Sequence, residues 1–334
     1  MKTNLESILY GKLSQKRMSP VYKMVRAEAP SSTANLGPGF DVFGLALDLF
    51  HDTVEIELGS EDGVTITVEG VDHERVSTGV QNNTAGLVAG MVMDAMKNRE
   101  GMRIRLIKGV PVGGGLGSSA ASSSACVLAL DEMFGLGLSS EDLVGLAAYG
   151  EVASAGVAHY DNAAAAVLGG FVIVSQEPLR LAHLKPPSNL EVAVAIPKIE
   201  LPKEKTKKMR DIIPKTVELD HAISNVAHAS LFVAGMALSD IAMIGAAMND
   251  LIVEPVRSKA IPMFASVRTV AFEAGASGFA ISGAGPTVVA LCNRVEVNTK
   301  DVAHVMKEGF EKGGISCDAY WTKPSGGAVV KERR

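Results

Sequence analysis

The sequence predicts a mixed fold of α-helices and β-strands in a chain long enough for two domains. Segments in which every second residue is apolar alternate along the chain with segments of helical apolar spacing. The 334 residues, 47% hydrophobic and 21% charged, are ordinary for a globular protein with a large core. A glycine-rich string at residues 111–124 joins a predicted strand, 103–109, to a predicted helix that starts near residue 120.

The string at 111–124 reads PVGGGLGSSAASSS and has the composition of an anion-binding loop. Glycines allow positive φ and close approach of the backbone to a ligand. The first turn of the following helix offers free N–H groups and the positive end of the helix dipole. Phosphate is the usual anion at such a site, so this stretch is predicted to bind phosphate.

The two commonest nucleotide-binding loops do not fit this string. A P-loop needs a lysine before its hydroxyl residue, and a dinucleotide-binding turn needs G-x-G-x-x-G, where this chain has Ser118 in place of the third glycine. A simple tight turn is the remaining alternative, and the length of the string favours a functional loop over it.

Charge and cysteine content favour small-molecule chemistry in a reducing compartment. The net charge of −5 gives no support for a nucleic-acid or anionic-membrane partner, and the basic clusters at 203–208 and 331–334 are expected to be solvated. Three scattered cysteines, Cys126, Cys292 and Cys317, suggest neither a disulfide framework nor a zinc cluster. No apolar run of membrane-spanning length and no secretory segment are evident, so a cytoplasmic protein is expected.

Residues 1–20 are expected to form an N-terminal extension, either a short amphipathic helix or a tail. The tail is favoured because 14–20 is polar and ends in proline. Imperfect alternation at 22–29 then leads into 30–41, PSSTANLGPGFD, where two glycines flank a proline among short polar side chains. This is predicted to be a binding loop; the alternative is a capped turn in which Asn35 and Asp41 only satisfy backbone groups.

The rest of the first half is predicted in order. Residues 53–58 and 64–68 are expected to pair as a hairpin, and 83–97 as a helix whose methionines fill core space. Ser118 and Ser119 are expected to cap the helix after the glycine string, and Gly135 and Gly137 to stop it near residue 134. A helix at 141–155, capped by Ser139 or Ser140, carries Glu151 near its end, where local grounds favour a solvated side chain.

The second half contains further predicted elements. The spacing H-x-D-N at 159–162 has no second histidine or thiol, which argues against a zinc or hydrolase site. Residues 169–174 are expected to form a buried strand, and the proline-rich segment 176–189 a connection between domains. A strand at 191–196, helices at 220–237 and 240–251, and two strands flanking a glycine turn at 278–292 follow.

Two strings resemble motifs of the galactokinase, homoserine kinase, mevalonate kinase and phosphomevalonate kinase superfamily. Residues 111–120 match its phosphate loop P-x-G-x-G-L-G-S-S-A, and 282–287, SGAGPT, match its third motif, which supports that loop. Within the superfamily the chain is most similar to the homoserine kinases. Residues 29–46 resemble A-x-S-[ST]-A-N-L-G-x-G-F-D-x-x-G-x-A with one additional residue before Ala34, and 150–162 resemble G-E-x-x-x-x-G-x-x-H-x-D-N. Residues 202–214 resemble T-x-x-x-R-x-x-L-P with Ile213 for leucine, and 253–257 resemble H-E-P-x-R with Val253 for histidine.

The resemblance, which spans 21–321, implies a two-domain α+β small-molecule kinase fold. It implies an N-terminal α+β ATP-binding domain at 21–180 with the glycine-rich phosphate loop, and a ferredoxin-like α+β C-terminal domain at 181–334. ATP and substrate would lie between them, in a cytoplasmic homodimer. The implied reaction converts ATP and L-homoserine to ADP and O-phospho-L-homoserine, on the threonine branch from aspartate.

The resemblance also implies roles for individual residues. Magnesium would be held by Ser119 and Glu151, and no carboxylate base is expected because Asn162 stands where sibling kinases have aspartate. Asp161 would bind the substrate ammonium and the arginines its carboxylate, with solvated surface arginines as the alternative. The implied catalytic residues are Asn35, Asn162, Ser119 and Glu151, and the substrate-binding residues are Asn35, Asp41, His159, Asp161, Thr206, Arg210 and Arg257. The implied nucleotide-binding residues are Asn83, with Asn82 and Thr84 beside it, and Pro111, Gly113, Gly114, Gly115, Leu116, Gly117, Ser118, Ser119 and Ala120.

One departure and two alternatives accompany this interpretation. The family commonly has V-A-P-A where this chain has four alanines at 163–166, so a different turn is expected there. A sibling kinase for mevalonate or a sugar should carry an aspartate near Asn162 and a basic partner near the first motif, and neither is clear. A non-catalytic nucleotide-binding relative should have lost Ser119, Glu151 or loop glycines, and none is lost.

Overall fold

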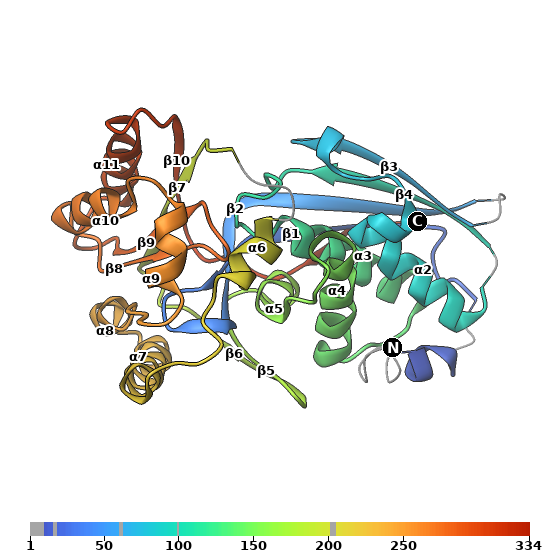
Figure 1. Ribbon diagram of the computed structural model, residues 1–334. Coiled ribbons are helices and arrows are strands. Elements are labelled where there is room, and N and C mark those ends of the chain that lie inside the picture. Colours follow the sequence, from blue (N-terminus) through green and yellow to red (C-terminus); the bar gives the residue numbers. More distant parts are fainter. Residues whose placement is uncertain (1–9, 16–18, 60–62, 99, 201–204) are drawn as a thin grey trace.

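The chain forms two β-sheets with helices packed against them (Figure 1). The computed structural model describes residues 10–15, 19–59, 63–98, 100–200 and 205–334. The first sheet has seven strands in the order β11-β1-β2-β4-β3, with β5 paired to β2 and β6 to β5. Its strands are β1 (Met24–Asn35), β2 (Gly39–Gly59), β3 (Val64–Gly70), β4 (Gly101–Lys108), β5 (Phe171–Gln176), β6 (Leu179–Leu184) and β11 (Val329–Arg333).

The second sheet has four strands in the order β10-β7-β9-β8. These are β7 (Leu190–Pro197), β8 (Gly278–Ile281), β9 (Val288–Asn293) and β10 (Cys317–Thr322), and each neighbouring pair is antiparallel. By chain order the strands lie fourth, first, third, second, which is the ferredoxin-like arrangement. The predicted two-domain mixed fold is therefore confirmed.

Helices cover the two sheets at opposite ends of the molecule (Figure 1). The first group is α2 (Thr84–Met96), α3 (Ser118–Phe134), α4 (Ser140–Ala155) and α5 (Tyr160–Leu168). The second group is α7 (Leu219–Leu238), α8 (Ile241–Ala246), α9 (Glu254–Arg257), α10 (Phe264–Glu273) and α11 (Thr299–Glu311), and α6 (Lys205–Asp211) lies between the groups. Three short 3₁₀ turns are also present, η1 (His73–Arg75), η2 (Val80–Asn82) and η3 (Ser258–Ala260).

Local chemistry sets several helix ends as expected. Ser139 caps α4 through a reciprocal pair of hydrogen bonds with Asp142, and Gly135 ends α3 in a left-handed conformation with φ 56°. The helix predicted at 240–251 is shorter than expected, because α8 ends at Ala246 and Asp250 instead accepts the backbone N–H groups of residues 252–254.

One apolar cluster connects the two sheets. The rings of Phe43 on β2, Phe171 on β5 and Phe232 on α7 have centroids 5.1–5.3 Å apart. All three side chains are buried, and they belong to the same cluster as Val192 and Val194 on β7. Aromatic contacts of this kind add to the stabilisation from buried area, so this cluster holds the two sheets together.

The predicted hairpin at 53–68 is wrong. β4 lies between the two segments, antiparallel to β2 and parallel to β3. Alternation identified both strands correctly, but it carries no information about which strand pairs with which, and the partner here comes from more than thirty residues along the chain.

The connection expected at 176–189 is also wrong for half of its length. Residues 179–184 form β6, an antiparallel partner of β5 in the first sheet. The chain leaves this sheet between β6 and β7, so the expected boundary at 180/181 falls inside a strand. The last strand, β11, then returns to pair with β1, which places part of the predicted C-terminal segment in the first sheet.

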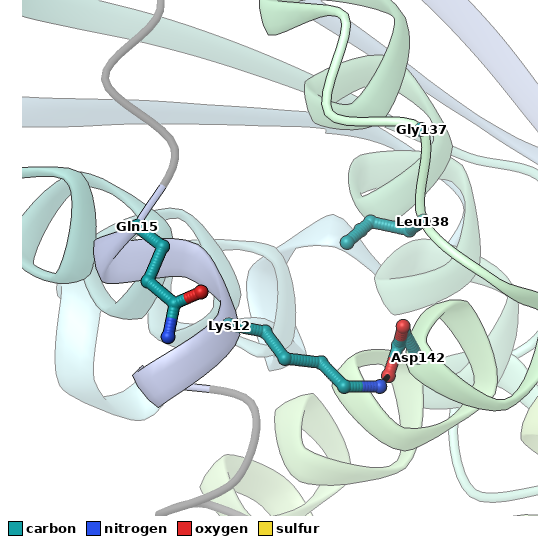
Figure 2. A pocket seen from close by; sticks show the side chains of 5 residues that line it. All are labelled: Lys12, Gln15, Gly137, Leu138 and Asp142. Atoms are coloured by element: carbon teal, nitrogen blue, oxygen red, sulfur yellow. Dashed lines mark hydrogen bonds and ion pairs between the residues drawn. The ribbon is translucent and has the colours of Figure 1, made fainter.

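The N-terminal extension is helical at 10–14, where the sequence favoured a tail. Leu13 is fully buried in the core beneath α2–α4, and Lys12 Nζ donates to Asp142 Oδ1 over 2.6 Å. Figure 2 shows Lys12 reaching across a hollow lined by Lys12, Gln15, Gly137, Leu138 and Asp142. The polar residues at 14–20 favoured a tail, but Leu13 just before them is apolar and packs in the core. Burial of Leu13 holds the segment on the domain.

Helix α7 presents apolar side chains to solvent. Leu219, Ile223, Val226 and Leu238 are each more than half exposed. By length and composition alone it is the one helix in the described ranges that could cross a membrane, and 22% of the relevant window is buried. One such helix is weak evidence for a membrane span.

We predict that Leu13→Ala lowers the free energy of unfolding by about 2–3 kcal/mol, because it removes a fully buried side chain and leaves a cavity. Lys12→Ala is the matched control. Its side chain is half exposed and its ion pair is of the surface type, so a change of less than about 1 kcal/mol is expected. Urea unfolding of both variants measures the difference, and equal effects would show that the segment does not anchor through Leu13.

Candidate active site

The phosphate loop, defined as residues 111–120, connects β4 to α3. Its glycines at 113, 115 and 117 have positive φ of 81°, 93° and 66°. Helix α3 begins at Ser118 with Gly117 at its N-cap position and no side-chain cap. The predicted serine caps are therefore wrong, because the Ser118 hydroxyl instead donates to Val110 O over 2.9 Å. An uncapped helix start beside a glycine loop is the arrangement that accommodates a phosphate.

The glycine turn at 282–287 supports the phosphate loop from the second sheet. Ser282 Oγ lies 2.7 Å from Gly115 O, and Thr287 N–H donates to Gly114 O over 3.2 Å. The approach at Gly115 is close, since a Cβ there would lie 2.5 Å from Ser282 O. Packing against this turn thus determines the path of the loop.

A buried ion pair lies beneath the loop and was missed from the sequence. Lys108 Nζ donates to Asp52, to Ser118 O over 3.0 Å and to Ser122 Oγ over 2.9 Å. Asp52 Oδ1 accepts the N–H groups of residues 109 and 110, each over 2.9 Å. Burial lowers the pKa of Lys108, and the Asp52 charge opposes that shift. The two residues are 56 positions apart, so no local spacing could have revealed the pair.

The substrate loop predicted at 30–41 is mostly strand, because 30–35 belong to β1 and 39–41 to β2, and only 36–38 lie between them. This segment packs on the glycine turn at 282–287. Asn35 Nδ2 donates to Gly283 O over 2.9 Å, and its Oδ1 accepts the N–H of Asp41 over 3.1 Å. Both residues have left-handed φ, 73° and 59°. The Asn35 amide is thus engaged within the protein, as in the capped-turn alternative.

Both predicted arginines meet at this loop. Arg210 on α6 contacts the Asp41 carboxylate with two nitrogens, each 2.8 Å away, which raises the pKa of Arg210. Arg257 on α9 is 5% exposed and donates to Gly283 O over 3.0 Å, and burial lowers its pKa to about 10. Both guanidinium groups lie over the ring of Phe40, so the alternative of solvated surface arginines does not hold for Arg257. Thr206 lies one turn before Arg210 on α6.

Of the predicted metal residues, Ser119 lies in the first turn of α3 and Glu151 near the end of α4, while the predicted ammonium residue Asp161 begins α5. Glu151 is 3% exposed, so the surface position favoured on local grounds is wrong. Its Oε2 lies 3.0 Å from His159 Nδ1, and its buried Oε1 has no hydrogen-bond partner among the described residues. Burial lowers the pKa of His159, but the hydrogen bond and charge of Glu151 outweigh burial and the net shift is upward.

Asp161 and Asn162 begin α5 beside the phosphate loop. Asp161 is buried, and burial together with the Asp41 charge raises its pKa to about 6. Asn162 Oδ1 accepts the hydroxyl of Ser32 over 2.9 Å, and it would lie 3.0 Å from a Cβ at Gly117. Residues 163–166, where a different turn was expected, continue α5, because without a proline each alanine keeps its N–H for the helix.

Asn83, for which a nucleotide contact is predicted, has a structural role in a helix cap, and Lys205 has a position that the sequence did not indicate. Asn83 is the N-cap of α2, with its Oδ1 accepting Gly86 N–H and its Nδ2 donating to Ser77 O. Asn82 and Thr84 flank that cap. Lys205, from the basic cluster expected to be solvated, is partly buried, and its Nζ donates to Gly113 O of the phosphate loop over 2.7 Å. Composition identifies a charge cluster, but it does not show which member faces inward.

Comparisons with known proteins agree with this geometry. Family models described as the GHMP kinases N terminal domain and GHMP kinases C terminal match residues 83–170 and 232–311. A homoserine kinase of Methanococcus maripaludis is 38% identical over 312 residues, covering 93% of this chain and 99% of that protein. This chain belongs to the homoserine kinase family of GHMP kinases.

Further relatives extend the likeness. A homoserine kinase of Halobacterium salinarum is 39% identical, covering 92% of this chain and 96% of its own length. The crystal structure of homoserine kinase from Cytophaga hutchinsonii has a TM-score of 0.86 at 36% identity, covering 94% of this chain and 99% of that one. The L. major mevalonate kinase, at a TM-score of 0.66 and 17% identity over 92% of this chain and 99% of its own, shares the fold.

We predict that Gly115→Ala and Gly114→Ala differ sharply in stability. Gly115 has a φ of 93°, and a Cβ at this position would lie 2.5 Å from a backbone oxygen, whereas the nearest atom to a Cβ at Gly114 is 3.7 Å away and its φ is not positive. Strain and overpacking of this kind cost about 1–3 kcal/mol, so Gly115→Ala should lower Tm by several degrees and Gly114→Ala should not. Calorimetry of both variants decides this, and equal Tm values would contradict the close contact with Ser282.

Proposed function

We propose that this chain transfers the γ-phosphoryl group of ATP to the hydroxyl oxygen of L-homoserine, giving ADP and O-phospho-L-homoserine on the threonine branch. One observation carries the proposal. An uncapped helix start after a glycine loop lies in the same region as a buried carboxylate, Asp161, and a buried guanidinium, Arg257. The 38% sequence identity with a homoserine kinase, over 93% of this chain, supports the choice of substrate.

We propose that the amino-acid end of homoserine is bound by opposite charges on the two sides of the site. Asp161, with Asp41 and His159 near it, would receive the ammonium, while Arg210 and Arg257 would receive the carboxylate. Guanidinium groups bind carboxylates in a bidentate manner. The buried Nε of Arg210 has no hydrogen-bond partner among the described residues, which leaves a donor for a ligand. Thr206 on the same helix would add a hydroxyl contact.

The residues proposed for magnesium fit a hard cation. Glu151 Oε1 is buried without a partner among the described residues, and a buried carboxylate oxygen needs a compensating donor or cation. Ser119 lies in the first turn of α3, the helix that packs against α4. One carboxylate and one hydroxyl, completed by phosphate oxygens and water, suit Mg²⁺. The ion, when bound, would neutralise charge on the phosphate groups.

We propose that phosphoryl transfer proceeds without a carboxylate base. The Asn162 amide cannot accept a proton at neutral pH, and it lies against Gly117 of the phosphate loop. Asn162 would position the substrate hydroxyl, with Asn35 holding the substrate loop in place. The hydroxyl proton would pass late to a phosphate oxygen as the new O–P bond forms and the bond to ADP breaks. Catalysis would then rest on positioning and electrostatic stabilisation.

The remaining parts of the proposal concern the setting of the reaction. Nucleotide would contact Asn83 and the phosphate loop, between domains at 21–180 and 181–334 that follow an extension at 1–20. A cytoplasmic location is supported by three free, buried cysteines. A homodimer is proposed as well, and the exposed apolar residues of α7 are an apolar surface of the kind that subunit contacts cover.

We predict ADP release with homoserine that exceeds release with mevalonate, galactose or threonine by at least about 100-fold in kcat/KM. Specific charge and hydrogen-bond contacts discriminate between substrates on this scale. A coupled ADP-release assay with Mg²⁺ compares the four compounds directly. Equal or faster turnover of mevalonate or a hexose would support the sibling-kinase alternative, and no turnover of any of them would support a non-catalytic relative.

We predict that the KM for homoserine rises as pH falls through about 6. The raised pKa of Asp161 means that its carboxyl is neutral below this pH and loses its attraction for the ammonium, while above about pH 7 it is ionised and KM is constant. Groups facing it are Asp41, His159 and Glu151.

The matched variant is Asp161→Asn, whose KM should be about 10-fold or more higher and independent of pH between 5 and 8. An inflection that persists in Asp161→Asn would assign the titration to another group, His159 being one that faces it. Loss of kcat with homoserine binding intact would instead make Asp161 a general base.

A further inference from the structure

Lys205 connects α6 to both glycine loops of the site. It is the first residue of α6. Its Nζ donates to Gly113 O of the phosphate loop over 2.7 Å, and also to Gly285 O of the turn at 282–287. These two loops come from different sheets. One ammonium group therefore connects α6 to the phosphate loop and to the glycine turn at 282–287.

The charges around Lys205 are unbalanced. No ion pair joins it to a carboxylate in the part of the chain that the structure describes, and the charged groups acting on it are Arg257 of α9 and Arg75 of η1. Arg75 itself is held by Val112 O at 2.9 Å and by Asp72 at 3.8 Å. On its own helix, Arg210 is paired with Asp41. Burial, together with the two cations, lowers the pKa of Lys205 to about 7.

An ammonium group that is partly withdrawn from water without an anion is costly, because carbonyl groups replace only part of its hydration. Arg75 has Asp72 beside it, and Arg257 feels the charges of Asp41, Asp161 and Asp250. Lys205 is therefore the cation of this group to which the described residues supply no carboxylate. The atom that Lys205 contacts, Gly113 O, belongs to the loop that precedes the uncapped start of α3. A phosphate at that helix start would lie within reach of the lysine.

We propose that Lys205 is a nucleotide-responsive clamp, which binds a phosphate oxygen of the nucleoside triphosphate and thereby fixes α6 over the site. Without nucleotide its ammonium rests on the two loop carbonyls. With nucleotide it exchanges at least one of them for phosphate, and Thr206 and Arg210 on the same helix are held in position for the amino acid. This inference rests on the proposed function, in which ATP is the phosphoryl donor.

Two consequences follow from this exchange. The negative phosphate stabilises the protonated lysine, so nucleotide binding above pH 7 is accompanied by proton uptake. Because Lys205 and Arg210 are on one short helix, nucleotide and homoserine each raise the affinity for the other by the same factor, as linkage requires.

The test is isothermal titration of the full chain with Mg²⁺ and a non-hydrolysable ATP analogue at pH 7.5, in two buffers of different ionisation enthalpy. We expect the wild-type protein to take up a fraction of a proton. Lys205→Met should bind the analogue about 10-fold or more weakly with no uptake. Lys205→Arg, which keeps its charge at all pH values, should bind within a few-fold of wild type and also take up no proton.

Controls separate this role from a merely structural one. Lys208→Ala removes an exposed cation from the same helix, and it should match wild type in affinity and proton uptake. Adenosine, which lacks phosphates, should bind wild type and Lys205→Met equally. Homoserine should bind wild type at least about 5-fold more tightly when the analogue is present, and this gain should be lost in Lys205→Met.

The outcomes distinguish the inference from the proposed function. Wild-type affinity and proton uptake in Lys205→Met, with homoserine kinase activity intact in the wild type, would overturn the clamp alone. Equal weakening by Lys205→Met and Lys205→Arg, with the same loss for adenosine, would show a packing role and would also overturn it. A wild-type protein that neither binds the analogue nor phosphorylates homoserine would overturn the proposed function.

Discussion

The site depends on one constraint, which is that the backbone of the phosphate loop is held by a glycine turn from the other sheet. Ser282 Oγ contacts Gly115 O, and Thr287 N–H donates to Gly114 O. An anion-binding loop must keep its N–H groups free for the ligand, so it cannot be rigid through side-chain caps of its own. Hydrogen bonds to its carbonyl groups solve this problem, because they immobilise the loop and leave the N–H side open. The left-handed glycines follow from the same requirement.

Beneath the loop, the Lys108–Asp52 ion pair also helps to immobilise the phosphate loop. Asp52 accepts the first two N–H groups after β4, and Lys108 bonds to the carbonyl of Ser118 and to Ser122 on α3. Strand, loop and helix are therefore joined through one buried ion pair. Such a pair adds little net stability compared with apolar residues, whereas losing one partner costs about 3–5 kcal/mol. The pair instead fixes geometry. Asp52 holds the N–H groups before the loop, and Lys108 holds the Ser118 carbonyl after it.

The two halves of the molecule contribute opposite charges to the site, and the apolar cluster around Phe43 and Phe232 keeps them in register. The first half contributes carboxylates, of which Asp161 and Glu151 are buried, and the second contributes the cations Lys205, Arg210 and Arg257. Arg210 and Asp41 pair with each other across the site. The proposed binding of a zwitterionic amino acid beside a polyphosphate would suit this distribution, because each ligand charge would meet an opposite charge in a site of low dielectric constant.

The sequence by itself determined the positions of β3, β4, β5 and the helices α2, α3 and α4, the glycine loops and the residue strings that name the family. These are local properties, set by apolar period, glycine conformation and motif spacing. Only the tertiary structure decided that β4 separates β2 from β3, that residues 179–184 pair as β6, that Leu13 anchors the N-terminal segment, and that Ser118 bonds Val110 rather than capping α3. The tertiary structure also decided that Asp52 pairs with Lys108 and that Lys205 contacts the phosphate loop. The physical reason is that strand pairing, burial and ion pairing depend on groups distant along the chain, and a one-dimensional pattern records which residues are apolar or charged but not which of them meet.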